Sequence, residues 1–353
     1  MTVNVGILGF AHSHVDAYCD AWREDEDHGI DVRIGWDHDR ERRQMAAGQH
    51  EIDTVAQSEE LLDRDDLDAV VVGAETAHHA DLVEAAAAAG KAIVLQKPVA
   101  LTLPEADRIV EAVDIHDVPF TMAWQMREDP QNRKIKELID SGELGQIFKL
   151  RRRHGLSTHL WDGFADTWHV DPGMNRDIWA DDASHPIDFV YWLFGEPESV
   201  TAEIMSLHDP AVPMDNGTAL FRYPDGPLVE VSCSFTNPAA ENTTEVVAEH
   251  GSIVQNYGDG PSCNVPRPDD APGLKWYRTD EGEWTISDLE TPDNHGDRIQ
   301  ALAGPLAEFL RGERAPIATA ADGRNALRMA LACYVSVREG RRVGLRDPAV
   351  TEV

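Results

Sequence analysis

Positively charged side chains are scarce in this sequence. It has 31 lysines and arginines against 64 aspartates and glutamates, which gives a net charge of −33, and only six of the basic residues are lysines. A chain this acidic repels nucleic acids and anionic membrane surfaces, so we expect neither as a partner. Because the acids are spread along a chain with 42% hydrophobic residues, the composition indicates a folded, halophile-adapted protein whose self-repulsion is screened by salt.

Cysteine is also scarce, and long apolar runs are missing. The four cysteines are Cys19, Cys233, Cys263 and Cys333. They lack the close spacings of a zinc ribbon or a redox pair and are too few for a disulfide framework. No apolar run has the length of a membrane span, and no secretory leader pattern precedes the first strand-like run. We therefore expect a cytoplasmic protein with reduced, structural cysteines.

Short runs rich in valine and isoleucine alternate with helix-like stretches in the first third of the chain. The runs include VNVGILG, DAVVVGA and KAIVLQ, and stretches such as HADLVEAAAAAG separate them. This alternation predicts an α/β domain with a parallel sheet at residues 1–124. After a helix near 129–141, alternating segments such as SVTAEIMSL and LVEVSCSFT predict a second, α+β domain at 125–353, built on a large, open, mostly antiparallel sheet.

The segment GFAHSH, at residues 9–14, follows the first strand-like run and allows more than one interpretation. In a dinucleotide-binding domain, this turn and the helix after it would hold a pyrophosphate. Asp37, at the end of the second strand, would then bind the ribose hydroxyls of NAD, although two arginines close by in the sequence leave NADP open. The glycine pattern is incomplete, because Ala11 and His14 stand where glycines are expected.

The alternative for this segment is a metal-dependent hydrolase on a barrel fold. His12 and His14 would then be metal ligands, because alternate residues of an extended segment point the same way and imidazoles suit zinc. That interpretation requires an eight-unit barrel, whereas the parallel alternation ends after about six units. A third interpretation is that both histidines only cap a turn. We favour the dinucleotide site and expect no metal.

The segment VLQKPVA, at residues 94–100, carries the first motif of a resemblance to a known family. In this chain Gln96, Lys97 and Pro98 stand where the Gfo/Idh/MocA family (glucose-fructose oxidoreductase, inositol dehydrogenase, rhizopine catabolism) has Glu-Lys-Pro. The chain resembles this family over nearly its whole length. The resemblance implies an N-terminal Rossmann-type domain, an NAD(P)-dependent oxidoreductase and a homodimer or homotetramer.

Two further motifs support the resemblance. The family's Asp-x-x-x-His matches Asp181 and His185, and its Asn-x-x-His is half kept, with Thr76 and His79. Asp181 and His185 are four residues apart, which would place them on one helical face, where the carboxylate fixes the imidazole tautomer. Asp182 is the competing carboxylate. We expect His185 to take the hydroxyl proton, Asp181 to orient it and Lys97 to polarise the reacting oxygen.

The segment at 154–180 is rich in aromatic and multidentate polar residues and is expected to close over a polyol. The family usually has a glycine pair where this chain has Asn175 and Arg176. The expected substrate-binding residues are Lys97, Arg127, Trp168, His169, Asn175, Arg176, Asp181 and His185. The expected cofactor-binding residues are Gly9, Phe10, Ala11, His12, Ser13, His14, Asp37, His38, Thr76, His79, Gln96, Lys97 and Gln125.

The resemblance favours hydride transfer between a nicotinamide and a secondary alcohol or ketone, or the anomeric carbon, of a sugar, sugar acid or cyclitol. Two alternatives share the fold: an NAD-dependent redox-assisted lyase or glycosidase, and a non-catalytic sugar sensor. The presence of both Lys97 and His185 argues against the sensor.

Overall fold

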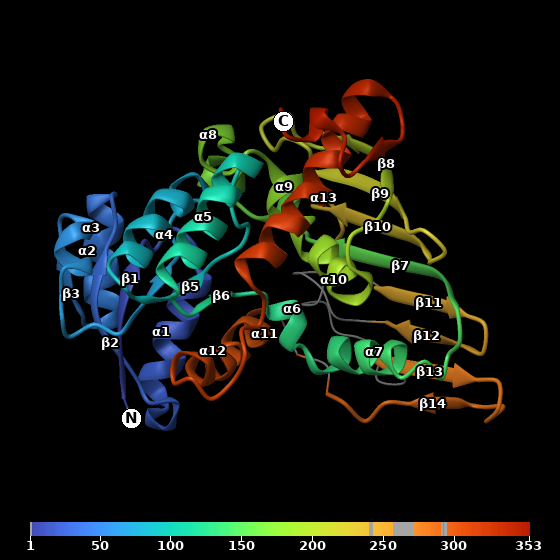
Figure 1. Ribbon diagram of the computed structural model, residues 1–353, viewed down its shortest axis with the longest axis horizontal. Coiled ribbons are helices and arrows are strands. Elements are labelled where there is room, and N and C mark those ends of the chain that lie inside the picture. Colours follow the sequence, from blue (N-terminus) through green and yellow to red (C-terminus); the bar gives the residue numbers. More distant parts are fainter. Residues whose placement is uncertain (1, 240–242, 257–270, 291, 293–294) are drawn as a thin grey trace. The chain divides into compact units, whose positions relative to one another are not determined.

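The computed structural model describes residues 2–239, 243–256, 271–290, 292 and 295–353 and divides into two compact units (Figure 1). Unit 1 comprises Met1–Gln125, Gly173–Asn175 and Arg298–Arg324, and unit 2 comprises Met126–Pro172, Arg176–Asp297 and Asn325–Val353. The sequence analysis assigned all of 125–353 to the second domain. Gln125 and two stretches of that range, Gly173–Asn175 and Arg298–Arg324, lie in unit 1.

Unit 1 contains a parallel six-stranded sheet in the order β3-β2-β1-β4-β5-β6. Its strands are β1 (Val3–Leu8), β2 (Ile30–Trp36), β3 (Asp53–Val55), β4 (Ala69–Val72), β5 (Ala92–Leu95) and β6 (Phe120–Met122). Its helices are α1 (His14–Glu24), α2 (Arg40–His50), α3 (Ser58–Leu62), α4 (His79–Ala88), α5 (Leu103–His116) and α12 (Ala303–Leu310). The order reverses between β1 and β4, as in dinucleotide-binding domains. The predicted α/β architecture is confirmed, and the open sheet excludes the barrel that the metal-hydrolase alternative requires.

The central strands of unit 1 are buried because helices cover the sheet. Ile7, Val71 and Val94 have no exposed surface, which explains why these strands are nearly continuous apolar runs rather than alternating ones. The three-residue β3 has no fully buried residue, and no apolar run in the sequence predicts this strand.

The turn after β1 depends on a glycine. Gly9 has a φ of +93°, and a Cβ on it would lie 2.5 Å from the backbone of Ala74, after β4. A side chain is therefore excluded both by the backbone conformation and by the close approach of the two strand ends. This contact brings the loops after β1 and β4 together at the carboxyl edge of the sheet.

Unit 2 contains a nine-stranded sheet in the order β14-β13-β12-β11-β7-β10-β9-β8-β15. The strands are β7 (Ile147–Gly155), β8 (Ser199–Met205), β9 (Asn216–Arg222), β10 (Leu228–Ser234), β11 (Thr244–Ala248), β12 (Gly251–Gln255), β13 (Leu274–Arg278), β14 (Trp284–Ile286) and β15 (Val343–Gly344). Only β7 and β10 pair in parallel among the described strands of this sheet. The predicted mostly antiparallel sheet is confirmed.

One face of this sheet is covered and the other is open. Val229 and Phe221 are fully buried, whereas Leu220 and Leu228 on the alternate positions are exposed. The α-helices that lie wholly in unit 2 are α7 (Pro130–Asp140), α9 (Ile178–Asp182) and α10 (Ser184–Phe194), and α10 packs against β7 and β10. The helices α6 (Gln125–Glu128), α8 (Pro172–Asn175), α11 (His295–Ala301) and α13 (Ala320–Glu339) contain residues of both units.

The described cysteines Cys19, Cys233 and Cys333 are free and buried, and Cys263 lies outside the described residues. Burial raises the pKa of the Cys19 and Cys333 thiols, which are therefore protonated and unreactive. Within the part of the chain that the structure describes, none of the helices combines the length and the apolar character needed to cross a membrane.

Candidate active site

The loop between β1 and α1 keeps one glycine, Gly9, and buries several of its larger side chains. Phe10 is buried, and its ring occupies the space beside Gly35, where a Cβ would lie 2.6 Å from it. The rings of His12 and His14 are buried and meet edge to face, with centroids 4.2 Å apart. Ala11, before them, is partly exposed, and Ser13, between them, is the N-cap residue of α1, whose side chain makes no capping hydrogen bond.

Asp37, directly after β2, is fully buried and accepts four hydrogen bonds. Two come from the backbone amides of Phe10 and Asp39, both at 2.8 Å. The other two come from Arg42, whose Nε and Nη2 lie 2.7 and 2.8 Å from the two carboxylate oxygens. A carboxylate has about four lone-pair directions. The expected ribose acceptor is therefore saturated by protein donors.

Arg42 also joins Asp37 to the loop after β4. Its Nη2 donates to Glu75 Oε1 at 2.8 Å. Partial burial disfavours the guanidinium charge, but the bonds to Asp37 and Glu75 outweigh it and raise the pKa of Arg42. His38 stands beside this group, with its Nδ1 3.6 Å from Glu75 Oε2. Glu75 was not among the site residues predicted from the sequence. Its signal was a carboxylate in the loop just beyond a buried strand, where ligands of parallel sheets bind.

The segment after β5 places Gln96, Lys97 and Pro98 in the interior. Gln96 has no exposed surface, and its Nε2 donates to the Tyr18 hydroxyl at 3.0 Å. A neutral amide here avoids the cost of burying the family's glutamate. Lys97 is 4% exposed and precedes a cis peptide bond to Pro98.

His79 holds the loop that carries Lys97. Its Nδ1 lies 2.9 Å from Pro98 O, and its Nε2 lies 3.1 Å from Ala74 O. Burial lowers the pKa of His79 to about 4, although these carbonyl contacts oppose the shift. Both ring nitrogens thus face backbone carbonyls, which indicates that His79 positions the loop rather than binding a ligand itself.

Gln125 and Asn175 are two buried amides in unit 1. Gln125, after β6, is 1% exposed, and neither of its amide atoms has a hydrogen-bond partner among the described residues. Asn175 has no exposed surface, and its Oδ1 accepts from the Thr76 hydroxyl at 2.8 Å. The orphaned amide of Gln125 at the carboxyl edge of the sheet fits a bound polar group such as a carboxamide. A dinucleotide therefore fits the residues of unit 1.

In unit 2, the helix expected around Asp181 and His185 is interrupted. α9 ends at Asp182 and α10 begins at Ser184. Pro186 lacks the N–H that would otherwise bond to the carbonyl of Asp182, so the helix is not continuous there. The helix on which the sequence places Asp181 and His185 is therefore interrupted between these two residues.

The carboxylates at this break face different histidines. Asp181 Oδ2 lies 2.8 Å from His169 Nδ1. Asp182 lies between two imidazoles, with its Oδ1 3.7 Å from His185 Nε2 and its Oδ2 3.5 Å from His154 Nε2. The competing carboxylate of the sequence analysis thus makes the ion pair with His185, and His154 is a neighbour that the sequence did not indicate.

Two neighbouring aromatic residues of the segment at 154–180 stack on each other. The rings of Trp168 and His169 are stacked, with centroids 4.0 Å apart, and both residues are partly exposed. Arg176 adopts a positive φ of 66°, which explains why the family usually has glycine here. Its guanidinium lies over the Tyr334 ring, 5.3 Å from the centroid.

Arg127, another expected substrate residue, is held by a buried carboxylate. Its Nε and Nη2 donate to Asp188 at 2.9 and 2.7 Å, and both side chains are buried. A bidentate pair of this kind fixes the guanidinium and removes most of its capacity to clamp a substrate anion. Asp188 lies seven residues beyond Asp181 on the expected helix, and no local pattern indicates the pairing.

Comparison with protein families covers both units. The model of the oxidoreductase family with an NAD-binding Rossmann fold (GFO_IDH_MocA) matches residues 3–123, and the model of the GFO/IDH/MocA C-terminal domain matches residues 132–254. The two matches together span more than half of the chain.

Individual relatives carry sugar dehydrogenase names. The chain is 25% identical to the D-apiose dehydrogenase of Paraburkholderia graminis, over 98% of this chain and 91% of that protein. It is 27% identical to the D-xylose 1-dehydrogenase [NADP(+)] of Haloarcula marismortui, over 61% of this chain and 62% of that one.

A solved structure shows the same fold. The levoglucosan dehydrogenase in complex with NADH and levoglucosan superposes with a TM-score of 0.80 at 20% identity, over 98% of this chain and 100% of that one. Sequence and structure point to the same family. Both family models match, unit 1 has the reversed strand order of a Rossmann fold, and unit 2 has a large mixed sheet. The chain belongs to the Gfo/Idh/MocA family of oxidoreductases, with an NAD-binding Rossmann fold at its N-terminus.

Proposed function

We propose that this protein transfers hydride between a nicotinamide dinucleotide and a secondary alcohol or ketone, or the anomeric carbon, of a sugar, sugar acid or cyclitol. The observation that carries the proposal is the burial of Lys97 directly after β5, at the edge where ligands of parallel sheets bind. An ammonium group at this edge can donate a hydrogen bond to polar groups of a bound substrate. A reacting hydroxyl is such a group, and its oxygen becomes more negative as hydride leaves the carbon.

We assign each residue one role. Lys97 donates a hydrogen bond to the reacting oxygen and stabilises its alkoxide character. His185 takes the hydroxyl proton during oxidation and returns it during reduction. When bound, the nicotinamide exchanges the hydride with the substrate carbon. Asp182 orients His185, because its Oδ1 lies 3.7 Å from His185 Nε2. Asp181 positions His169, one of the substrate-binding residues.

We propose NAD as the cofactor and keep NADP as a second candidate. Asp37 lies where a carboxylate selects NAD, but Arg42 neutralises its charge. If the ion pair with Asp37 opened, Arg42 would be able to bind the 2′-phosphate of NADP. The relatives support both cofactors, since one solved neighbour is in complex with NADH and one relative is named for NADP.

We propose a sugar-derived substrate, because the relatives are named for apiose, xylose and levoglucosan. The stacked rings of Trp168 and His169 offer an apolar face to sugar carbons. Arg176 lies in the same segment and would suit a carboxylate, which keeps sugar acids within the class.

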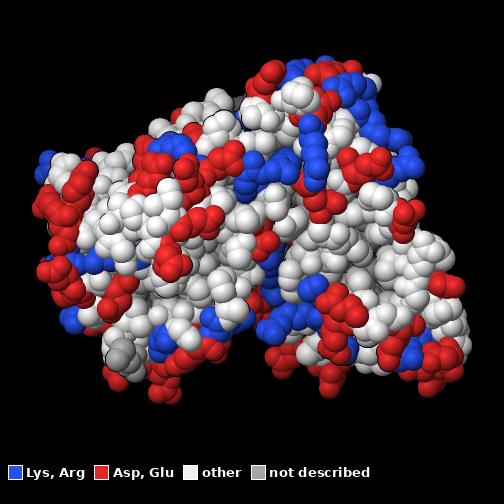
Figure 2. Space-filling view, in the orientation of Figure 1, with Lys and Arg blue, Asp and Glu red and all other residues white. Residues whose placement is uncertain are grey.

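We further propose a homodimer or homotetramer in the cytoplasm. The open face of the nine-stranded sheet carries exposed Leu220, Leu228 and Val247 beside charged residues, a composition that suits a second copy of the chain. Acidic side chains are spread over the visible surface of both units, which supports the absence of nucleic-acid and membrane partners (Figure 2). The buried free thiols support a reducing compartment.

The test is absorbance at the reduced-nicotinamide band in multimolar salt, with NAD or NADP against aldoses, sugar acids and inositols. We expect one substrate class to reduce the cofactor, and Lys97→Ala and His185→Ala to lower kcat by about 10²–10⁴-fold. Cofactor binding, measured as a thermal shift, should persist in His185→Ala.

The matched control is Lys91→Met. Lys91 is the other buried lysine of unit 1, and its Nζ donates to the carbonyls of Arg64 and Leu67. It should lose stability but keep kcat. Cofactor binding without turnover of any substrate, in either direction, would contradict simple dehydrogenation and favour the lyase or the sensor.

A further inference from the structure

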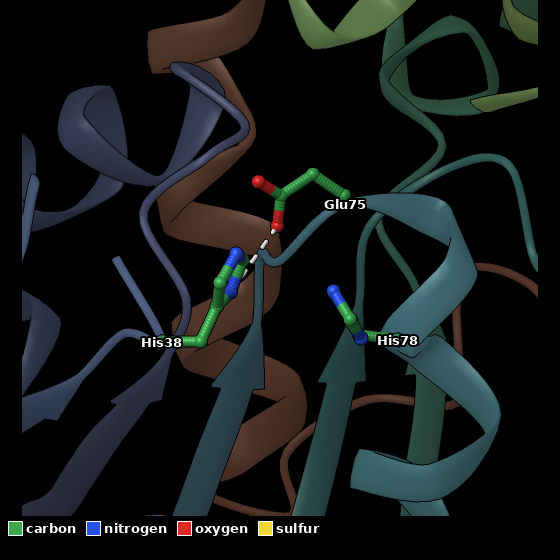
Figure 3. Close-up of side chains that lie close together, drawn as sticks. All are labelled: His38, Glu75 and His78. Atoms are coloured by element: carbon green, nitrogen blue, oxygen red, sulfur yellow. Dashed lines mark ion pairs between the residues drawn. The ribbon is translucent and has the colours of Figure 1, made fainter. Parts of the chain in front are cut away.

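We propose that His38, Glu75 and His78 form a binding site for a divalent transition-metal ion, a site that the sequence analysis did not expect. His38 follows β2, and Glu75 and His78 lie at the turn after β4 (Figure 3). All three belong to unit 1. The loops after β2 and β4 thus bring two imidazoles and a carboxylate from separate parts of the chain to the same edge of the sheet.

The spacing of the three side chains is close to that of a metal site. One potential ligand atom from each residue lies within 4.8 Å of the others. Bonds of about 2.0–2.1 Å in a tetrahedral zinc site place ligand atoms about 3.4 Å apart. His38 Nδ1 is already 3.6 Å from Glu75 Oε2. The His38 side chain is 40% exposed. A small rotation of its ring would bring Nδ1 to the spacing of a zinc ligand.

Two buried atoms of this cluster have lone pairs or protons without hydrogen-bond partners. Glu75 is 4% exposed, and its Oε2 makes no hydrogen bond among the described residues. The same holds for His78 Nε2. Leaving a buried polar atom unsatisfied costs about 1–3 kcal/mol. A metal ion would satisfy both atoms, which is the independent reason for inferring a ligand here.

The surroundings orient the cluster and set its charge. Arg42 Nη2 holds Glu75 Oε1 at 2.8 Å, so the other carboxylate oxygen is turned to the two histidines. Asp37 Oδ1 lies 3.7 Å from His38 Nδ1. With neutral imidazoles, Asp37, Glu75 and Arg42 together carry one net negative charge, which favours a cation.

The ligand set selects the class of metal. Imidazole nitrogens with one carboxylate suit zinc, cobalt or nickel, whereas magnesium and calcium prefer oxygen ligands throughout. Three protein ligands leave one coordination position open, as in zinc sites that bind water or a further ligand. The alternative occupant is a proton on His38, which would make an ordinary ion pair with Glu75.

The experiment is a calorimetric titration of chelator-treated, tag-free protein with Zn²⁺ alone, repeated with Co²⁺ while its visible absorption is recorded. We expect one saturable site per chain and a Co²⁺ spectrum with nitrogen ligands. Both His38→Gln and His78→Gln should weaken Zn²⁺ binding by tenfold or more. The loss of a residue that only supports a metal ligand already lowers metal affinity about 10- to 100-fold. Thermal unfolding without metal checks that each variant folds.

The matched control is His250→Gln. His250 is an exposed histidine whose Nε2 lies 3.9 Å from Glu249 Oε2, a pair without a second imidazole, and its loss should leave Zn²⁺ binding unchanged. Weak, non-saturating binding that is equal in the wild type, His38→Gln and His78→Gln would overturn the proposal and indicate surface carboxylates. The titration uses neither dinucleotide nor sugar, so its outcome is independent of the proposed dehydrogenase activity.

Discussion

Arg42 and Asp37 form a bidentate ion pair, with two hydrogen bonds of 2.7 and 2.8 Å between guanidinium and carboxylate. The backbone amides of Phe10 and Asp39 take the remaining acceptor directions of the carboxylate. The residue expected to read the ribose diol is therefore neutralised and saturated. We therefore expect discrimination between NAD and NADP to depend on the ion pair rather than on Asp37 alone.

We predict that Asp37→Ser shifts the enzyme toward NADP. The substitution releases Arg42 to pair with a 2′-phosphate and removes the carboxylate that repels it, so the ratio of kcat/KM for NADP to that for NAD should rise about 10- to 100-fold. The control is Asp39→Ser, which keeps a side-chain acceptor for Arg42 N at the start of α2. A ratio that is unchanged in Asp37→Ser, or that moves toward NAD, would show that Arg42 does not reach the phosphate.

The sequence predicted those features that depend on local pattern. The runs VNVGILG and KAIVLQ became β1 and β5 because strands buried on both faces must be continuously apolar. The pairing of Arg42 with Glu75 joins residues 33 positions apart, and nothing in either local segment encodes it. Such contacts depend on the register of β2 and β4 around β1, which only the folded sheet defines.

The break in the helix between Asp181 and His185 has a local cause that the sequence did contain. A spacing of four residues predicts a shared face only if the helix is regular, and Pro186 makes the carbonyl of Asp182 lose its helical partner. Pro186 can be read from the sequence. Which carboxylate faces His185, however, depends on the turn at Ala183, which only the structure shows. Motif spacing therefore does not predict the contact between His185 and Asp182.

We predict that Asp182→Asn lowers kcat more than Asp181→Asn does. Asp182 makes the ion pair with His185, so its loss should lower kcat by about 10- to 100-fold and leave the KM for the dinucleotide unchanged. Asp181→Asn removes the partner of His169 and should chiefly raise the KM for the sugar. Steady-state kinetics of both variants separate the two roles. A larger loss of kcat in Asp181→Asn would return the orienting role to Asp181.

We predict that His79 makes the fold sensitive to acid. Its pKa is about 4 in the folded chain because of burial, against about 6.5 in an unfolded chain. The unfolded chain therefore binds the proton first as the pH falls. The contribution of the neutral imidazole is fully present above about pH 6.5 and is lost between there and pH 4, by up to about 3 kcal/mol.

Denaturant unfolding of the wild type and His79→Gln between pH 7 and pH 4.5 measures this contribution. The difference in unfolding free energy between the two proteins should shrink as the pH falls, since glutamine does not titrate there. The exposed His116 supplies a control, because His116→Gln should leave the pH dependence of the wild type unchanged. A constant difference across the range would contradict a depressed pKa for His79.

We predict that salt stabilises this protein by screening. A net charge of −33 opposes compaction, and the Debye length falls from about 10 Å at 0.1 M salt to about 3 Å at 1 M. The Tm should therefore rise with KCl concentration, and a non-ionic osmolyte at equal osmotic strength should give a smaller rise. A Tm that is flat, or that falls with KCl, would remove the case for adaptation to high salt.

A double variant on α5 distinguishes screening from a general salting-out effect. Glu111 and Asp114 are exposed acids three residues apart on one helix, and Asp114 lies near its C-terminus, where a negative charge opposes the helix dipole. Glu111→Gln with Asp114→Asn should add about 0.2–0.5 kcal/mol of stability in dilute salt. In multimolar KCl the two charges are already screened, so the variant and the wild type should unfold at the same temperature. An equal gain at both salt concentrations would mean that repulsion between carboxylates is not what salt relieves.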